Sequence, residues 1–189
     1  TPEATRKEAW LKELSSFIVI ANRKTWAGAG AEVEPRRPGY TRLQWPSPAD
    51  KTTDKDKRDY AGWEDWRLED EFTGFLRAPG MTTIYYKDKP AWTMQYGGHG
   101  QTEGYEDKVK GTFEFLRRAL MGVPSELPLR GPELYEEENK RYKFEMLEGN
   151  IEDGLWREKI VEDGQMTFTQ TGLNGIVINK DANRQPANP

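Results

Sequence analysis

Residues 155–171 read LWREKIVEDGQMTFTQT, and this stretch decides the fold class. The turn signal Glu162-Asp163-Gly164 separates two runs, 155–161 and 166–171, whose β-branched and aromatic residues predict strands. A third such run, 142–147, comes shortly before them. Parallel neighbours need a crossover of about a dozen residues or more. The three runs therefore predict an antiparallel meander.

Segments with the two-residue alternation of β-strands also occur closer to the N-terminus. Residues 60–77 are rich in aromatic side chains and predict one or two strands. Residues 81–87 and 91–97 predict a hairpin that turns across the polar segment 87–90. These strands extend the antiparallel pattern of the meander.

Two segments repeat apolar residues at helical spacing instead. The first predicted helix begins near Pro2 and ends before Gly28, and its apolar stripe is Trp10, Leu14, Phe17 and Ala21. The second covers about 105–120, with the stripe Tyr105, Val109, Phe113, Leu116 and Leu120. Helices set among antiparallel strands predict an α+β fold, namely a curved antiparallel sheet with two main amphipathic helices packed on one face.

The chain is expected to form a single α+β domain over residues 1–189. Residues 46–59 are led by prolines and alternate in charge, which predicts a mobile charged insertion. Residues 180–189 predict a polar tail. The 45 residues before the insertion are too few for a core of their own, so the insertion marks no domain boundary.

Composition excludes several classes of protein. There is no Cys, so disulfides, thiolate nucleophiles and Cys-based metal centres are excluded. No apolar run reaches the ~20 residues of a membrane span. A cytoplasmic protein is expected; because the chain begins at Thr1, an exported form whose signal peptide has been removed stays open. The net charge of -4 argues against nucleic acid as a partner, since nucleic-acid binding normally needs a basic stripe.

His99 is the one histidine, within Gly97-Gly98-His99-Gly100. Imidazole titrates near neutrality, which makes His99 the one weak candidate for a catalytic residue, with Glu103 or Glu106 as its carboxylate. The alternative is an exposed loop histidine after a strand. The glycine spacing matches neither nucleotide-binding fingerprint.

Glu64, Asp65, Glu69, Asp70 and Glu71 form an acidic cluster. Paired carboxylates can hold hard cations or act as acid and base, but the pattern of a calcium loop is absent. We interpret the cluster as a solvated strand face or as a charged strand edge that deters aggregation. No metal and no cofactor are expected.

Aromatic and arginine residues supply the candidates for a binding site. Trp63 and Trp66 have opposite parity, so in a regular strand one of them would face outward and mark a binding surface. Tyr96 shares one strand face with Trp92 and Met94, where a core role is the alternative. Arg37 and Arg130 lie beside prolines on stiffened loops and, with Trp26 and the glycine-rich turn, can form an anion pocket or a purely structural contact. The candidate ligand-binding residues are Trp26, Arg37, Trp63, Trp66, Tyr96, His99 and Arg130.

Several segments together resemble a known family. They are 17–31 (FIVIANRKTWAGAGA), 37–39 (RPG), 90–97 (PAWTMQYG), 115–120 (FLRRAL) and 128–132 (PLRGP). Their order is similar to an uncharacterised bacterial domain-of-unknown-function family that occurs alone or behind an N-terminal helix-turn-helix. The resemblance covers about residues 14–178. It implies no activity, cofactor or catalytic residue, and the fusion to DNA-binding modules implies at most a sensor or interaction role.

Three functions follow as hypotheses. The first is a non-enzymatic, sensor-like domain that binds a small molecule or a protein through an aromatic and arginine-lined site. The second is a hydrolase-like enzyme using His99 with a nearby carboxylate. The third is a self-assembling structural or surface protein, a homo-oligomer favoured if Trp63 and Trp66 pack against another chain.

Overall fold

The computed structural model describes residues 1–28, 30–48 and 59–189, except for the side chains of residues 98 and 99. The elements are α1 (Pro2–Lys24), β1 (Glu32–Val33), β2 (Tyr40–Trp45), β3 (Trp66–Thr73), β4 (Gly80–Tyr86), β5 (Lys89–Gln101), the 3₁₀ turn η2 (Glu106–Lys108), α3 (Val109–Leu120), β6 (Leu134–Glu137), β7 (Lys140–Gly149), β8 (Asp153–Glu162), β9 (Gln165–Ile176), β10 (Asn179–Lys180) and β11 (Pro186–Ala187). Most of the predicted insertion 46–59 lies outside the described residues.

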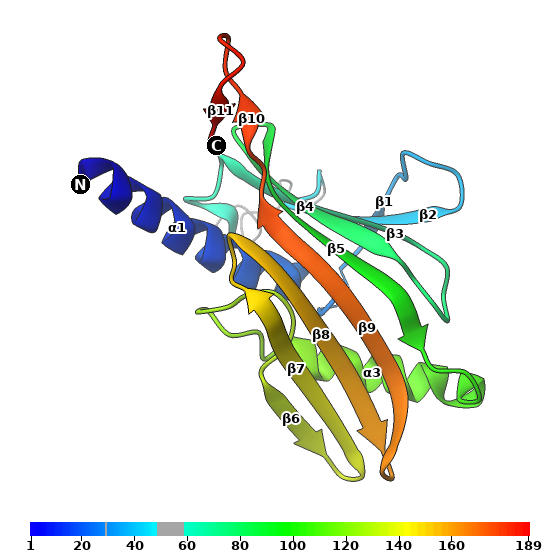
Figure 1. Cartoon of the computed structure of the whole chain (residues 1–189). Helices are drawn as coiled ribbons and strands as arrows, with labels where there is room; N and C mark the ends of the chain where they lie inside the picture. Colours follow the sequence, from blue (N-terminus) through cyan, green and yellow to red (C-terminus); the bar gives the residue numbers. More distant parts are fainter. Residues whose placement is uncertain (29, 49–58) are drawn as a thin grey trace.

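Within the described residues, nine strands form one open, mildly curved sheet in the order β1-β2-β3-β4-β5-β9-β8-β7-β6 (Figure 1). Every neighbouring pair is antiparallel. Between β5 and β9 the chain makes α3 and the strands β6 to β8, so β9 returns to pair with β5 at the middle of the sheet. This arrangement confirms the predicted α+β class.

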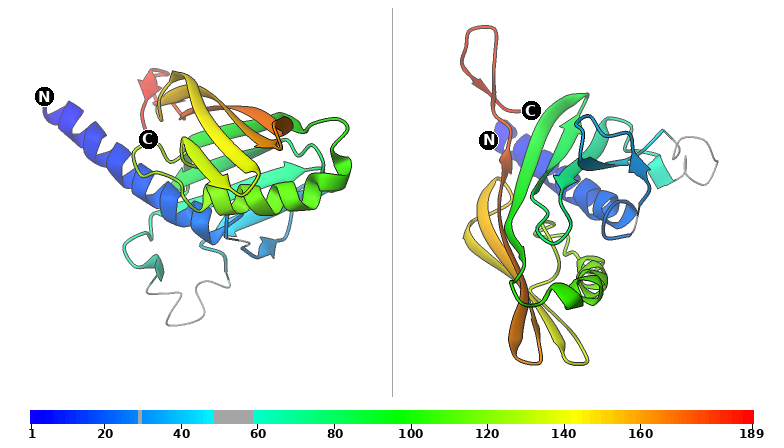
Figure 2. Two further views of the ribbon diagram at one scale, coloured as in Figure 1. Left: turned by 90° about the horizontal axis from the view of Figure 1, so that it is seen from below. Right: turned by 90° about the vertical axis from the view of Figure 1, so that its right-hand side faces the viewer.

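Both helices pack on the same face of the sheet, which we call the inner face (Figure 2). From α1, Leu14, Phe17 and Ile18 are fully buried there. From α3, Phe115 and Ala119 are buried too. The inner face of the strands supplies alternate large residues such as Trp92 and Trp156, as the period of two requires. The core is therefore one apolar layer between the helices and the sheet.

Local signals account for the ends of α1. The Thr1 hydroxyl accepts a hydrogen bond from the Ala4 backbone N–H at 3.3 Å, which caps the helix. Glu3 lies in the first turn, and Arg23 and Lys24 lie in the last, so the side-chain charges complement the helix dipole. Residues 1–9 are exposed and project beyond the sheet (Figure 1).

Two sequence-based expectations need correction. Trp63 precedes β3 instead of alternating with Trp66 along it, and the rings of both pack against Phe17 at centroid distances of 5.7 and 5.5 Å. The segment around His99 continues β5 to Gln101 through a bulge between Gly97 and Gly100 and is not a loop after the strand.

The polar segment 180–189 is exposed apart from Ala187, and β10 and β11 pair as a small hairpin there.

Candidate ligand-binding site

A cavity of about 310 Å³ lies on the inner face, between the sheet, α3 and the segment that follows α1. Much of its wall is aromatic: Trp26, Phe72, Phe75, Tyr96, Phe113 and Phe168. The volume is at the lower end of the range of small-molecule sites, and an apolar wall with a few polar groups is typical of such sites.

The cavity brings together three of the residues that the sequence singled out: Trp26, Tyr96 and Arg130. They come from distant segments, namely the turn after α1, the strand β5 and the loop between α3 and β6. The Arg130 guanidinium carbon lies 3.8 Å from the centroid of the Trp26 ring and 5.6 Å from that of Tyr96. The aromatic and arginine contact expected from the sequence is thus present on this face.

Arg130 is held by a buried ion pair. Its Nε and Nη2 atoms both donate to Oε1 of Glu158, at 2.9 and 2.6 Å, and the two side chains are 2% and 0% exposed. The Tyr142 hydroxyl donates to Oε2 of Glu158 at 2.8 Å, and the Gln170 amide donates to Oε1. Glu158 thus accepts four hydrogen bonds, three at Oε1 and one at Oε2, and the charge of Arg130 is matched.

Asp70 is the buried carboxylate that lines the cavity itself. The Thr82 hydroxyl donates to its Oδ1 at 2.8 Å, and the Tyr96 hydroxyl lies 3.0 Å from both of its oxygens. Among the described residues, no Lys or Arg nitrogen lies within 4.0 Å of Asp70. Its charge, unlike that of Glu158, has no ion-pair partner there.

Burial sets the protonation of this group. Desolvation raises the pKa of Asp70, and the donors Thr82 and Tyr96 only partly oppose that effect. Burial, together with the charge of Asp70, raises the pKa of the Tyr96 phenol well above its usual value. Tyr96 therefore stays protonated at neutral pH and donates to Asp70. A buried carboxyl with a perturbed pKa beside a cavity is typical of functional sites.

Replacing Asp70 with asparagine is expected to stabilise the fold by about 0.5–2 kcal/mol at neutral pH, because it removes a buried carboxylate that has no ion-pair partner among the described residues. The folded pKa is raised, so the wild type loses stability as pH rises from the unfolded value of about 3.9 through the folded one. The difference in the free energy of unfolding between Asp70→Asn and the wild type should therefore increase as pH rises over that range. Urea titrations at several pH values measure this difference. A variant less stable than wild type at neutral pH would contradict this.

Two glycines, Gly80 and Gly100, leave room for Tyr96 and for the wall of the cavity. A Cβ at Gly80, which pairs with Tyr96 across the sheet, would lie 2.5 Å from the Tyr96 hydroxyl oxygen. Gly100 has φ +60, and a Cβ there would lie 2.9 Å from the Arg77 Cα. Because Gly100 has no side chain, the segment 74–79, which carries Phe75, can approach the β5 bulge at the cavity.

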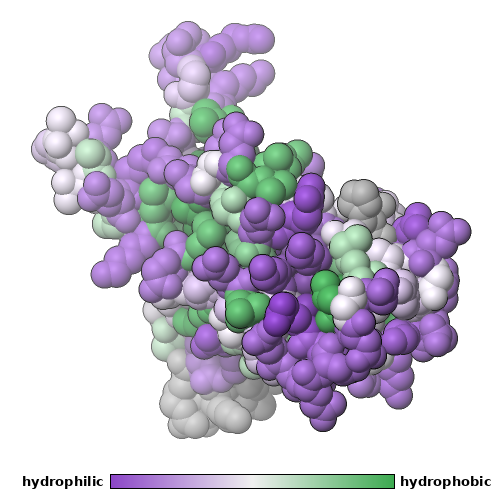
Figure 3. All heavy atoms as spheres, turned by 60° about the horizontal axis from the view of Figure 1, so that its bottom comes forward, coloured by the Kyte–Doolittle hydropathy of each residue, from purple (hydrophilic) through white to green (hydrophobic). Residues whose placement is uncertain are grey.

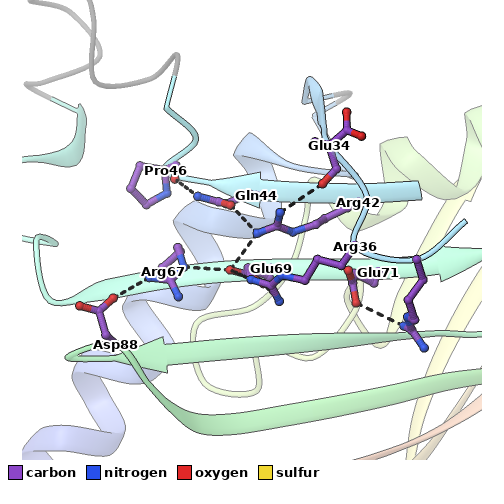
Figure 4. A network of polar contacts seen from close by, with 10 residues as sticks. Glu34, Arg36, Arg42, Gln44, Pro46, Arg67, Glu69, Glu71 and Asp88 are labelled. Carbon is purple, nitrogen blue, oxygen red and sulfur yellow. Dashed lines mark hydrogen bonds and ion pairs between the residues drawn. The ribbon is translucent and has the colours of Figure 1, made fainter. Parts of the chain in front are cut away.

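The acidic cluster is not the solvated strand face that the sequence suggested. Asp70 is 1% exposed on the inner face, and Glu69 is 4% exposed on the opposite, outer face. Three guanidinium groups surround Glu69: Arg36 at 2.7 Å, Arg42 at 3.0 Å and Arg67 at 3.0 Å (Figure 4). The alternation of Leu68, Asp70 and Phe72 was the signal that could have placed Asp70 inside.

The other predicted residues lie away from the cavity. Arg37 pairs with Glu71 of the outer face at 3.2 Å and stacks on Tyr40, so it does not meet Arg130. Trp66 is in the core and Trp63 is half-buried against it. The backbone of His99 belongs to β5, and its side chain lies outside the described residues. The hydrolase hypothesis therefore stays a prediction.

Three further findings concern metal binding, a second hollow and membrane-spanning helices. In the part of the chain that the structure describes, no group of three or more His, Asp or Glu residues is arranged to hold a metal ion. A second hollow, about 730 Å³, lies between the loop 124–133 and strands β7 and β8, but all of its charged residues are exposed except Lys159, which is half-buried. No described helix is long and apolar enough to cross a membrane. The inner-face cavity is therefore the stronger candidate.

Comparison with known proteins adds a family but no activity. No curated protein and no solved structure matches the chain. A family model described as a domain of unknown function, DUF5680, matches residues 70–177. That range runs from Asp70 to just beyond β9, so it includes Tyr96, Arg130, Glu158 and Gln170 but not α1 or Trp26. Because the match covers more than half of the chain, this protein belongs to the DUF5680 family, as the resemblance to a domain of unknown function predicted.

Proposed function

We propose that the chain is a non-enzymatic, sensor-like domain that binds a small molecule in the inner-face cavity. The observation that carries this proposal is an aromatic cavity of about 310 Å³ with two buried charged residues, Asp70 and Arg130, in its wall. Sites of this kind place a few polar groups in an apolar wall, so that the wall provides affinity and the polar groups orient the ligand.

The polar groups have capacity left for a ligand. Arg130 uses Nε and Nη2 for Glu158, and among the described residues its Nη1 has no hydrogen-bond partner. This nitrogen of Arg130 can donate to an ordered water in the cavity or to a polar group of a ligand.

A small molecule fits the observations better than a macromolecule. The surface seen in Figure 3 is largely hydrophilic, and its apolar residues form small separate groups. Scattered apolar residues of this kind are normal on monomeric proteins. Trp63 and Trp66, on which the self-assembly hypothesis was based, both pack on Phe17 of their own chain, and self-assembly stays a prediction.

Filling the cavity should abolish binding. Thr41 is half-buried on β2, lines the cavity and pairs with Phe72 across the sheet, so an indole at this position would occupy the space. A strand position tolerates an aromatic residue, so Thr41→Trp should fold. Native mass spectrometry of protein purified without refolding should show extra mass that is lost on denaturation from the wild type and is absent from Thr41→Trp.

The matched control is Thr171→Trp, which adds the same side chain on the outer face of β9, opposite Gly97 and Arg157. It should keep the extra mass. Extra mass retained by Thr41→Trp would place the ligand elsewhere. A bare wild type that no member of a metabolite panel stabilises against heat would also count against the proposal.

A further inference from the structure

The charges that face the cavity do not balance. Arg130 and Glu158 neutralise each other through an ion pair of 2.6 Å in which both side chains are buried. Asp70 is equally buried, and its bonded partners are two hydroxyl groups. With Asp70 ionised, the buried set of Asp70, Arg130 and Glu158 carries one negative charge more than positive. A buried unpaired charge is costly unless a counter-charge arrives.

The neighbours of Asp70 on each packed element leave that imbalance in place. Thr82 on β4 and Tyr96 on β5 are neutral donors. Arg130, from the loop before β6, attracts Asp70 through space but makes no ion pair with it, whereas Glu71 repels it. The two charged side chains at the exposed rim, Glu32 before β2 and Arg117 on α3, are opposite in sign. None of these groups forms an ion pair with Asp70.

The carboxylate also has acceptor sites to spare. Oδ1 accepts a hydrogen bond from the Thr82 hydroxyl. The Tyr96 hydroxyl lies at equal distances from Oδ1 and Oδ2 and is the one donor to Oδ2 among the described residues. A carboxylate offers about four lone-pair sites, so Oδ2 can accept further N–H donors. Phe72 and Phe113 belong to the same wall, and the π-face of an aromatic ring attracts a cation.

We infer that the ligand of this cavity is a small organic cation, with a protonated amine directed at Oδ2 of Asp70 and an apolar body against the aromatic wall. The inference rests on the proposed function and names its ligand class. An anionic ligand fits less well, because Arg130 is already matched by Glu158 and an anion would add to the unpaired negative charge of Asp70.

Three probes of similar shape distinguish cationic, neutral and anionic ligands. They are phenethylamine, phenethyl alcohol and hydrocinnamate, which are cationic, neutral and anionic, respectively, at neutral pH. Binding to the full chain is measured by ligand-observed NMR and calorimetry. The amine should bind at least about tenfold more tightly than the alcohol, since a charge-assisted hydrogen bond is roughly twice as strong as a neutral one. The carboxylate should bind most weakly.

Two variants assign the effect to Asp70. Asp70→Asn should reduce the affinity for the amine to that for the alcohol. Glu148→Gln removes a charge from an exposed position of β7 that does not line the cavity, and it should leave binding unchanged. Circular dichroism and urea titration establish that both variants fold.

The outcomes separate this inference from the proposed function. Equal affinity for amine and alcohol, tightest binding of the carboxylate, or no binding of any probe would overturn the cation assignment. If the alcohol or the carboxylate binds and Thr41→Trp prevents it, the cavity is still a ligand site and only its assigned class is wrong. Amine binding that survives Thr41→Trp would overturn both.

Discussion

Replacing Glu158 with alanine is expected to cost about 3–5 kcal/mol of the free energy of unfolding, because it leaves Arg130 buried without its partner. The Tyr142 hydroxyl and the Gln170 amide lose their acceptor as well. Urea unfolding followed by far-UV circular dichroism measures the loss. Domains of this size have total stabilities of only about 5–15 kcal/mol, so the variant should be close to unfolding.

Two controls test whether the cost comes from the unpaired buried charge. Arg118 and Glu137 form an ion pair of similar hydrogen-bond geometry, with distances of 2.9 and 2.8 Å, but on the surface. Glu137→Ala should therefore have little effect. The double variant Arg130→Met with Glu158→Met should be more stable than Glu158→Ala, since neither charge remains. A double variant no better than Glu158→Ala would mean that packing, and not charge, dominates.

Replacing Phe17 with alanine should cost a comparable amount, about 3–5 kcal/mol, because the change leaves a cavity at the centre of an aromatic cluster. The Phe17 ring is fully buried and lies 5.5–5.7 Å from the rings of Trp45, Trp63 and Trp66. It is also the main aromatic contact of α1 with β2 and β3. Thermal unfolding should show the loss, and tryptophan emission should shift as the three indoles gain access to water.

Phe75→Ala is the matched control, since the Phe75 ring is 66% exposed. It should leave both the melting temperature and the emission nearly unchanged. If Phe17→Ala is no more damaging than this control, α1 does not dock on the sheet through the aromatic cluster.

The parts of the fold that sequence reasoning predicted are those with strong periodicity. The hairpin of β4 and β5 and the meander of β7, β8 and β9 alternate apolar residues across recognisable turns, and the structure confirms them. Both helices also follow from their apolar stripes. In these segments local pattern and tertiary packing agree, which makes prediction reliable.

The unpredicted strands lacked such a signal. Tyr40–Trp45 follows a loop rich in proline and glycine and is stabilised by pairing with β3, a contact distant in sequence. Leu134–Glu137 is four residues long and pairs with β7 at the edge of the sheet. Strand formation there depends on neighbours that a single sequence does not reveal.

The sequence identified some residues of the candidate site and missed others. Aromatic and arginine content singled out Trp26, Tyr96 and Arg130, which the structure brings to one cavity. Asp70 and Glu158 were missed as site residues because acidic residues in charged strands are usually solvated, and their burial depends on the partners that the fold assembles. Arg37 was grouped with Arg130 by its similar loop, but it pairs with Glu71 on the outer face.

Crystals of the full chain soaked with a fragment library would test the central claim most directly. We expect bound fragments to concentrate in the inner-face cavity, against Trp26 and Phe113, with amines placed within hydrogen-bonding distance of Asp70. Fragments found only on the outer face or in the hollow beside β7, with the inner-face cavity closed by its own side chains, would contradict the account.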